Sequence, residues 1–295
     1  MNLIGAKIYS DGSNYIAIPH TERPYRKRNT PPPPTDEQAE TVEKFTKFFN
    51  KKKGKRKTRK AQLLKEMLPL FKEETEATEF VEKHFERLSR NRWERYKRMK
   101  RRAYNYIWSY FVTFTYANEK QTEETFKKQL KNCLYHLSNR KGWRYIGAWE
   151  RGEKGQRLHF HALIYIPPNA MVGKLETVKE YSTKRHKWEE KVLNTFFGNR
   201  FGKTEFDEIH NQYEVADSIV YMLKYITKND ERVVYSRGLK TYFVSDILDE
   251  DILCPMGDEE HGFQYILAPN FKCIVDGEIL GTVSPEIIEN MPKSN

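Results

Sequence analysis

Apolar residues recur every three or four positions in several stretches of the chain, the spacing that predicts helices with one buried face. The clearest stretch covers residues 123–139, where Phe126, Leu130, Leu134 and Leu137 fall on one side. Similar spacing predicts further helices over residues 35–50, beginning near Thr35, over 61–105 with a break near Pro69, over 187–197 and over 215–227.

Other stretches combine β-branched and aromatic residues in the short runs that are typical of strands. The strongest covers residues 157–167, where the sequence RLHFHALIYIP ends at two prolines. Residues 145–150 form a second run, and the glycine-containing turn between the two predicts a hairpin. Weaker strand patterns occupy residues 6–9, 15–18, 106–116, 202–210, 263–268 and 271–275, whereas 168–182 is predicted to be a loop.

These elements alternate between strands and helices over residues 106–227 in a way that favours an antiparallel sheet flanked by helices, an α+β fold. We expect four segments in the chain. They are a basic, partly disordered arm over residues 1–60, a basic helical segment over 61–105, a central domain over 106–243 and an acidic segment over 244–295.

Charge divides the chain into two unequal parts. The formal net charge is +11 and aromatic residues make up 14% of the sequence. Residues 245–295 carry eleven acidic side chains against two lysines, so the preceding 244 residues carry a net charge of +20. Cations for phosphates and flat rings for unpaired bases suit a surface that binds single-stranded nucleic acid.

Residues 51–60 contain eight basic side chains in ten. This run is either an arm that grips DNA or a solvated, disordered charge run, and the two interpretations are compatible because such arms often order on binding.

Three widely separated cysteines make neither a disulfide framework nor a C-x-x-C metal site, so a reducing compartment is expected. No apolar run approaches the ~20 residues of a membrane span, and the N-terminus lacks the pattern of a signal peptide. We therefore expect a cytoplasmic protein with no membrane partner.

Two histidines mark the strongest predicted strand as a candidate site. His159 and His161 share one face, about 7 Å apart at ~3.3 Å per residue, because successive strand side chains alternate. Two imidazoles at that spacing can share a metal ion, and the hairpin can bring Glu150 opposite them to add a carboxylate. The alternative is a pair of partly exposed histidines without a metal.

The predicted helix over residues 215–227 carries two tyrosines, and two lysines follow them in the pattern YMLKYITK. Tyr221 and Tyr225 are four residues apart and therefore lie on one helix face. Lys224 and Lys228 each follow a tyrosine by three residues.

The His-x-His pair followed by Y-x-x-K on a later helix resembles the HUH endonucleases that initiate rolling-circle replication. The doubled Y-x-x-K resembles the two-tyrosine initiators of small single-stranded DNA phages and of related plasmids. Residues 110–115 are similar to the first strand of that family, and the order of motifs is that of replication initiators, since relaxases place the tyrosine first. The resemblance covers roughly residues 110 to 240.

This resemblance implies a ferredoxin-like sheet with the histidines on a central strand, and an enzyme that nicks single-stranded origin DNA. A tyrosine would attack the phosphorus, leaving a 5′-phosphotyrosine and a free 3′-hydroxyl, and a later transfer would rejoin the strands. The implied catalytic residues are Tyr221, Tyr225, Lys224 and Lys228, although Tyr225 could instead be a core residue. The implied metal ligands are His159, His161 and Glu150, with Glu153 and His210 as weaker alternatives.

Mg²⁺ or Mn²⁺ is the ion that the resemblance implies, although the ligand types alone would also accept Zn²⁺, Co²⁺ or Ni²⁺. Arg237 and Lys240 lie in a segment similar to one that follows the tyrosine helix in relatives, and we expect them to hold DNA phosphates. The chain lacks a P-loop, so a helicase and a polymerase from a bacterial host or a partner are expected.

Three other interpretations stay open. The first is a single-strand transposase or a relaxase of the same superfamily. The second is a non-catalytic, basic nucleic-acid-binding protein, which the charge and the aromatic residues would serve equally well. The third is a structural zinc protein, which is weakened because no cysteine joins the histidines.

Overall fold

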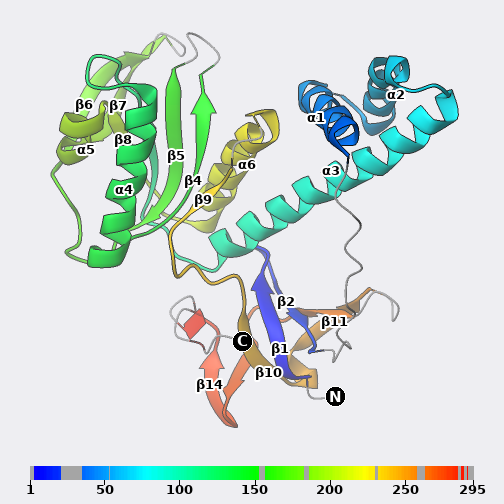
Figure 1. Ribbon diagram of the computed structural model, residues 1–295. Coiled ribbons are helices and arrows are strands. Elements are labelled where there is room, and N and C mark those ends of the chain that lie inside the picture. The colour runs from blue at the N-terminus through cyan, green and yellow to red at the C-terminus, as the bar shows by residue number, and fades with distance from the viewer. Residues whose placement is uncertain are drawn as a thin grey trace. The chain divides into compact units, whose positions relative to one another are not determined.

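A computed structural model describes residues 3–20, 35–52, 54–152, 157–182, 186–229, 232–257, 263–284, 287–288 and 291, and the side chains of residues 224–229 lie outside this description. The described residues form six α-helices and two antiparallel seven-stranded sheets (Figure 1), which confirms the predicted α+β class. Contacts divide the chain into two compact units. The first contains both sheets, and the second contains the N-terminal helices up to Lys97.

The first sheet contains the strand with the two histidines. Its order is β6 (Leu175–Ser182), β7 (Lys187–Asn194), β8 (Thr204–Glu208), β3 (Tyr110–Thr115), β5 (Leu158–Tyr165), β4 (Arg144–Arg151) and β9 (Val234–Tyr235). Strand β5 pairs with β3 on one side and with β4 on the other. The histidine strand is therefore interior, and the predicted hairpin of β4 with β5 is confirmed.

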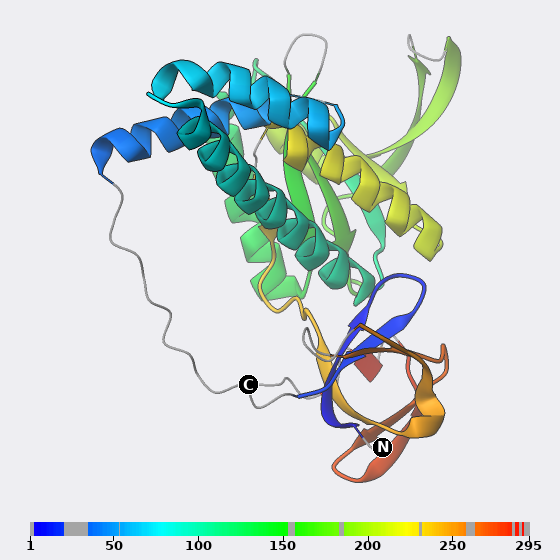
Figure 2. The ribbon, with the colours of Figure 1, turned by 90° about the vertical axis from the view of Figure 1, so that its right-hand side faces the viewer.

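Helices cover both faces of this sheet. Figures 1 and 2 show α4 (Glu123–Lys141) and α6 (Gln212–Asn229) on opposite sides of it. Alternation along β5 explains the two layers: Phe160 and Ile164 pack with α4 and α5 (Thr195–Phe201), whereas Leu163 packs with α6 and the end of α3 (Glu74–Tyr104). Complete burial of a side chain of this size stabilises the fold by roughly 1.5–3 kcal/mol.

Helix α4 forms where the sequence predicts it, because both of its ends carry local stop signals. The Thr122 side chain accepts a hydrogen bond from the backbone nitrogen of Thr125 and caps the N-terminus. Gly142 ends the helix in the left-handed region, with φ of 72°, which glycine adopts without steric cost.

The predictions for residues 168–197 are partly wrong. Residues 175–182 were expected in a loop and 187–197 in a helix, but they form the antiparallel pair β6 and β7, with α5 beginning at Thr195. Apolar residues at 188, 192, 193 and 196 mimic helical spacing, yet Trp188 is 69% exposed. Cross-strand contacts such as the Tyr181–Trp188 ring pair stabilise the hairpin instead.

The second sheet joins both ends of the sequence. Its order is β11 (Ile252–Met256), β12 (Gln264–Leu267), β2 (Tyr15–Ile18), β1 (Leu3–Ser10), β10 (Phe243–Ile247), β13 (Lys272–Val275) and β14 (Glu278–Thr282). In the register of β1 with β10, Ala6 faces Ser245 and Ile8 faces Phe243. The side chains of Ala6, Ile8 and Phe243 are fully buried, so the acidic C-terminal segment and the first residues share one core.

The second unit is helical and contains α1 (Asp36–Lys51), α2 (Arg56–Met67) and α3 up to Lys97. Thr35 caps α1 as predicted, and the predicted break at Pro69 falls in the short 3-10 helix Leu68–Leu70. The second half of the basic run lies in α2, where Arg56 and Lys60 pair with Glu86 of α3. The four-segment division stays a prediction. Among the described helices, none is long and apolar enough to cross a membrane.

Candidate active site

His159 and His161 lie on the same face of β5, as the strand alternation predicts. Their ring centroids are 5.9 Å apart and the ring planes differ by 19°, so the rings are nearly parallel. His161 is buried and His159 is partly exposed. The pair therefore presents two imidazoles side by side on the face of the sheet that α6 covers.

Two threonines of β3 hold the rings. Thr113 Oγ1 lies 3.1 Å from His161 Nδ1, and Thr115 Oγ1 lies 3.2 Å from His159 Nδ1. The register of β3 with β5 explains this match, since Thr113 faces His161 and Thr115 faces His159. Each ring thus has its Nδ1 engaged on the β3 side and keeps its Nε2 for other partners.

Glu150 reaches the pair from β4. Its Cα faces that of His159 in the register, but its carboxylate Oε2 lies 2.6 Å from His161 Nε2. Both side chains are buried, with 8% and 6% of their side-chain surfaces exposed. The prediction that the hairpin brings Glu150 to the histidines is confirmed, although the carboxylate contacts the more distant of the two.

The donor set has the composition of a divalent metal site, with two imidazoles and one carboxylate on one face. Within the described residues, however, no group of three His, Cys, Asp or Glu side chains is arranged to hold a metal ion. The donors are therefore present in kind without converging on one point, and metal binding at His159, His161 and Glu150 stays a prediction. Of the weaker alternatives, Glu153 lies outside the described residues, and His210 follows β8.

Burial lowers the pKa of His159 below its ordinary value, and the adjacent His161 lowers it further, while the Glu150 carboxylate acts in the opposite direction. The His159 ring is therefore neutral near pH 7. A neutral imidazole keeps a lone pair for a metal, whereas a protonated one does not.

Tyr221 lies directly against this pair. Its ring centroid is 5.0 Å from that of His161 at 83°, and 5.8 Å from that of Phe111 at 88°. Helix α6 holds it there because the neighbouring Ile219 and Met222 are buried in the core under the helix. The structure thus brings together the first predicted tyrosine and the predicted histidines.

The other predicted residues of α6 are placed by their backbone alone. Tyr225, Lys224 and Lys228 lie within the helix Gln212–Asn229, which confirms the predicted helix. Their side chains lie outside the described part of the chain, so their roles stay predictions.

Arg237 and Lys240 make contacts away from the histidines. The Arg237 guanidinium lies over the ring of Tyr135 on α4, 5.3 Å from its centroid, and Lys240 Nζ donates to the carbonyl of Ile288 at 3.4 Å. Helix α4 covers the opposite face of the sheet from His161. DNA binding by these two residues stays a prediction, and no contact described above joins them to the candidate site.

Sequence reasoning missed the roles of Thr113, Thr115 and Glu205. The signal for the threonines is their alternation on a strand that precedes the histidines, but the register that pairs them is not visible in the sequence. Glu205 faces Thr113 from β8 and forms ion pairs with Lys191 at 2.7 Å and Lys203 at 2.9 Å. The same face therefore also carries a neutralised carboxylate.

Comparison with known proteins gives one match. No curated protein and no solved structure matches the chain. Residues 109–230 match a family model described as a replication-associated protein of the ORF2 type, a span that runs from β3 to the end of α6 and contains the histidines and Tyr221. The part of the chain that carries the candidate site is therefore similar to the ORF2 family of replication-associated proteins.

Proposed function

We propose that this protein is a replication initiator that nicks single-stranded DNA at an origin and later rejoins the strands. The observation that carries the proposal is the position of the Tyr221 ring, 5.0 Å from the ring of His161. His161 is itself bonded to Glu150. A nucleophile beside two imidazoles and a carboxylate, in a segment that matches a replication-associated family, supports phosphodiester transesterification.

In the proposed step, Tyr221 Oη attacks the phosphorus of the scissile phosphodiester. The Oη–P bond forms, the P–O3′ bond breaks, the phenolic proton is lost to solvent, and O3′ takes up a proton. The products are a 5′-phosphotyrosine and a free 3′-hydroxyl that a polymerase can extend. Attack by a 3′-hydroxyl on the phosphotyrosine reverses the step and rejoins a strand.

Tyrosine has an ordinary pKa of ~10, so the reaction near pH 7 needs charge stabilisation. In the proposal, His159 Nε2, His161 Nε2 and Glu150 hold a divalent ion, Mg²⁺ or Mn²⁺. When bound, this ion supplies positive charge to the phosphate. Lys224 would stabilise the phenolate, and Thr113 and Thr115 keep the two rings aligned.

The proposal includes Tyr225 as a second nucleophile with Lys228 as its partner. Helix positions four apart have Cβ atoms ~5–6 Å from each other, so two tyrosines can alternate at one site. One would hold the 5′ end while the other cleaves the regenerated origin.

Single-stranded origin DNA is the proposed substrate, with Arg237 and Lys240 as proposed phosphate contacts. The net charge of +20 over the first 244 residues supports a polyanionic partner. Unwinding and extension would come from a helicase and a polymerase in the cytoplasm of a bacterial host.

Formation of a covalent protein–DNA adduct tests this function. The protein would be mixed with single-stranded oligonucleotides from its own replicon, with Mn²⁺ or with EDTA, and resolved on denaturing gels. We expect a Mn²⁺-dependent adduct that persists when either Tyr221→Phe or Tyr225→Phe is made and disappears in the double variant. Tyr213→Phe is the matched control, because Tyr213 is on the same helix and 85% exposed.

Three outcomes would count against the proposal. An adduct that survives in the double variant would place the nucleophile elsewhere. Tight DNA binding without any adduct in the wild-type protein would favour the non-catalytic nucleic-acid-binding interpretation. Cleavage at the ends of a mobile element, in place of a replication origin, would favour a transposase.

A further inference from the structure

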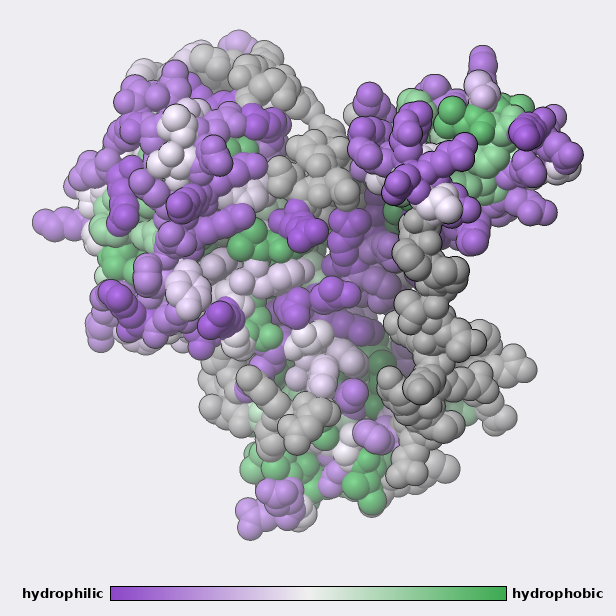
Figure 3. All heavy atoms as spheres, viewed as in Figure 1, coloured by the Kyte–Doolittle hydropathy of each residue, from purple (hydrophilic) through white to green (hydrophobic). Residues whose placement is uncertain are grey.

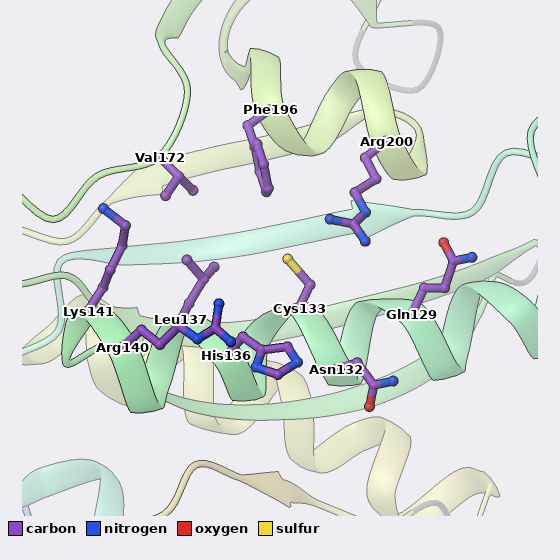
Figure 4. A pocket seen from close by; sticks show the side chains of 10 residues that line it. All are labelled: Gln129, Asn132, Cys133, His136, Leu137, Arg140, Lys141, Val172, Phe196 and Arg200. Atoms are coloured by element: carbon purple, nitrogen blue, oxygen red, sulfur yellow. The ribbon is translucent and has the colours of Figure 1, made fainter.

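A pocket of about 570 Å³ lies between α4 and α5, on the face of the first sheet opposite to the histidines. Figure 4 shows Phe196 and Arg200 projecting from α5 toward α4, with Cys133 and Leu137 of α4 facing them. Val172, from the segment after β5, closes one end. Its volume is within the ~300–1,000 Å³ typical of small-ligand sites.

The charge of this pocket is of one sign. Arg140, Lys141 and Arg200 line it, and no carboxylate does. Within the described residues, none of these three cations forms an ion pair, although the Arg200 guanidinium lies over the ring of Phe201 at 5.3 Å. By contrast, Lys191 and Lys203 in the same domain are neutralised by Glu205 of β8. Three uncompensated cations around one cavity favour a phosphate-bearing ligand.

The floor of the pocket is apolar. Phe196, Leu137 and Val172 contribute carbon surface, and the Phe196 ring packs edge-on against Phe197 at 5.1 Å. The Gln129 amide lies beside Arg200 in Figure 4. An aromatic face for stacking, cations for phosphate and an amide for a base edge are the groups that recognise an unpaired nucleotide.

We propose that this pocket binds one unpaired nucleotide of the single-stranded DNA substrate, as a second contact on the opposite face from the nicking site. In this assignment Arg140, Lys141 and Arg200 hold the backbone phosphates and Phe196 stacks on the base. A strand suits the pocket better than a free nucleotide because the site is open along α4, whose outward surface is mainly hydrophilic in Figure 3. The inference rests on the proposed function for the identity of its ligand.

Fluorescence anisotropy with a labelled single-stranded oligonucleotide tests this assignment in EDTA, so that cleavage does not contribute. The Arg140→Glu, Arg200→Glu double variant is expected to bind about tenfold or more weakly than wild type. The matched control is Lys128→Glu, Lys131→Glu, which reverses two exposed charges of α4 that do not line the pocket. We expect the control to lose less than about a third of that effect in free energy, because it removes long-range attraction alone.

Phe196→Leu separates stacking from charge. Leucine keeps the apolar bulk but removes the aromatic face, so we expect weaker binding of the single strand and unchanged binding of a duplex of the same sequence, since its bases are already stacked. Circular dichroism melting of each variant would confirm folding.

Equal losses in the pocket variant and the control would overturn the proposal. So would competition by dAMP at micromolar concentration, which would assign the pocket to a free nucleotide, or by inorganic phosphate, which would assign it to a simple anion. Failure of the proposed function is distinguishable, because the absence of any covalent adduct leaves this binding comparison intact.

Discussion

His161 is the residue with the most informative contacts in the candidate site. Its Nδ1 faces the Thr113 hydroxyl at 3.1 Å, and its Nε2 faces the Glu150 carboxylate at 2.6 Å. With Glu150 ionised, Nε2 carries the hydrogen and donates it, and Nδ1 accepts from Thr113. A metal ion on Nε2 would move the hydrogen to Nδ1, and Thr113 would then accept. A hydroxyl serves both states because it both donates and accepts.

This exchange of roles predicts a specific effect of Thr113→Val. Valine keeps the β-branched shape that suits β3 but removes the hydroxyl, so the His161 ring loses the partner that orients it. We expect Mn²⁺ to bind about tenfold more weakly, measured by electron paramagnetic resonance without DNA. Thr113→Ser should restore the affinity, and Thr177→Val, at an exposed position of β6, should leave it unchanged. Wild-type affinity in Thr113→Val would show that the contact is incidental.

At the scale of elements, the sequence predicts what depends on local pattern. The helix over 123–139 and the hairpin of β4 with β5 follow from capping residues, periodicity and a turn, and both are observed. The β6–β7 hairpin was missed because its stability comes from cross-strand pairs such as Tyr181 with Trp188. The register that sets Thr113 against His161 is likewise a long-range property, so the sequence alone placed the histidines but not what holds them.

Helix α3 carries a buried histidine that should make the helical unit sensitive to pH. His84 packs on Phe80 with ring centroids 4.1 Å apart, and its buried Nδ1 has no hydrogen-bond partner among the described residues. Burial, assisted by Arg87 and Lys83, lowers the pKa of His84 to about 4. The unfolded chain binds this proton near pH 6.5, so stability is complete above pH 6.5 and falls between pH 6.5 and 4.

We expect this single group to reduce the free energy of unfolding by about 1–2 kcal/mol between pH 7.5 and pH 5, allowing for solvent screening at the ring edge. Urea unfolding at both pH values, compared with His84→Phe, isolates the effect because all other groups titrate equally in the two proteins. An identical pH dependence in both would contradict the assignment.

At the scale of the whole molecule, residues from both ends of the sequence complete one sheet. Strand β1 lies between β2 and β10, and Ile8 at its centre is fully buried. No local pattern predicts this pairing, since the partners are separated by most of the chain. The sequence-based expectation of a basic arm followed by independent segments could therefore not anticipate it.

Ile8→Asp tests this closure of the chain. A buried, unpaired carboxylate in β1 should cost several kcal/mol and open the second sheet. Hydrogen exchange measured by mass spectrometry should show loss of protection in residues 243–247 and 264–267, with residues 110–115 less affected. Unchanged protection in 243–247 would show that the two ends do not pair.

The central claim is that Tyr221, beside the histidine pair, is a nucleophile toward DNA. The most direct measurement is mass spectrometry of proteolytic peptides from the wild-type protein after reaction with single-stranded origin DNA and Mn²⁺ and digestion of the DNA. We predict a nucleotide attached through phosphate to Tyr221 in most of the modified peptides, and to Tyr225 in the remainder. A nucleotide attached to any other residue, or no attachment despite cleavage of the DNA, would contradict the account.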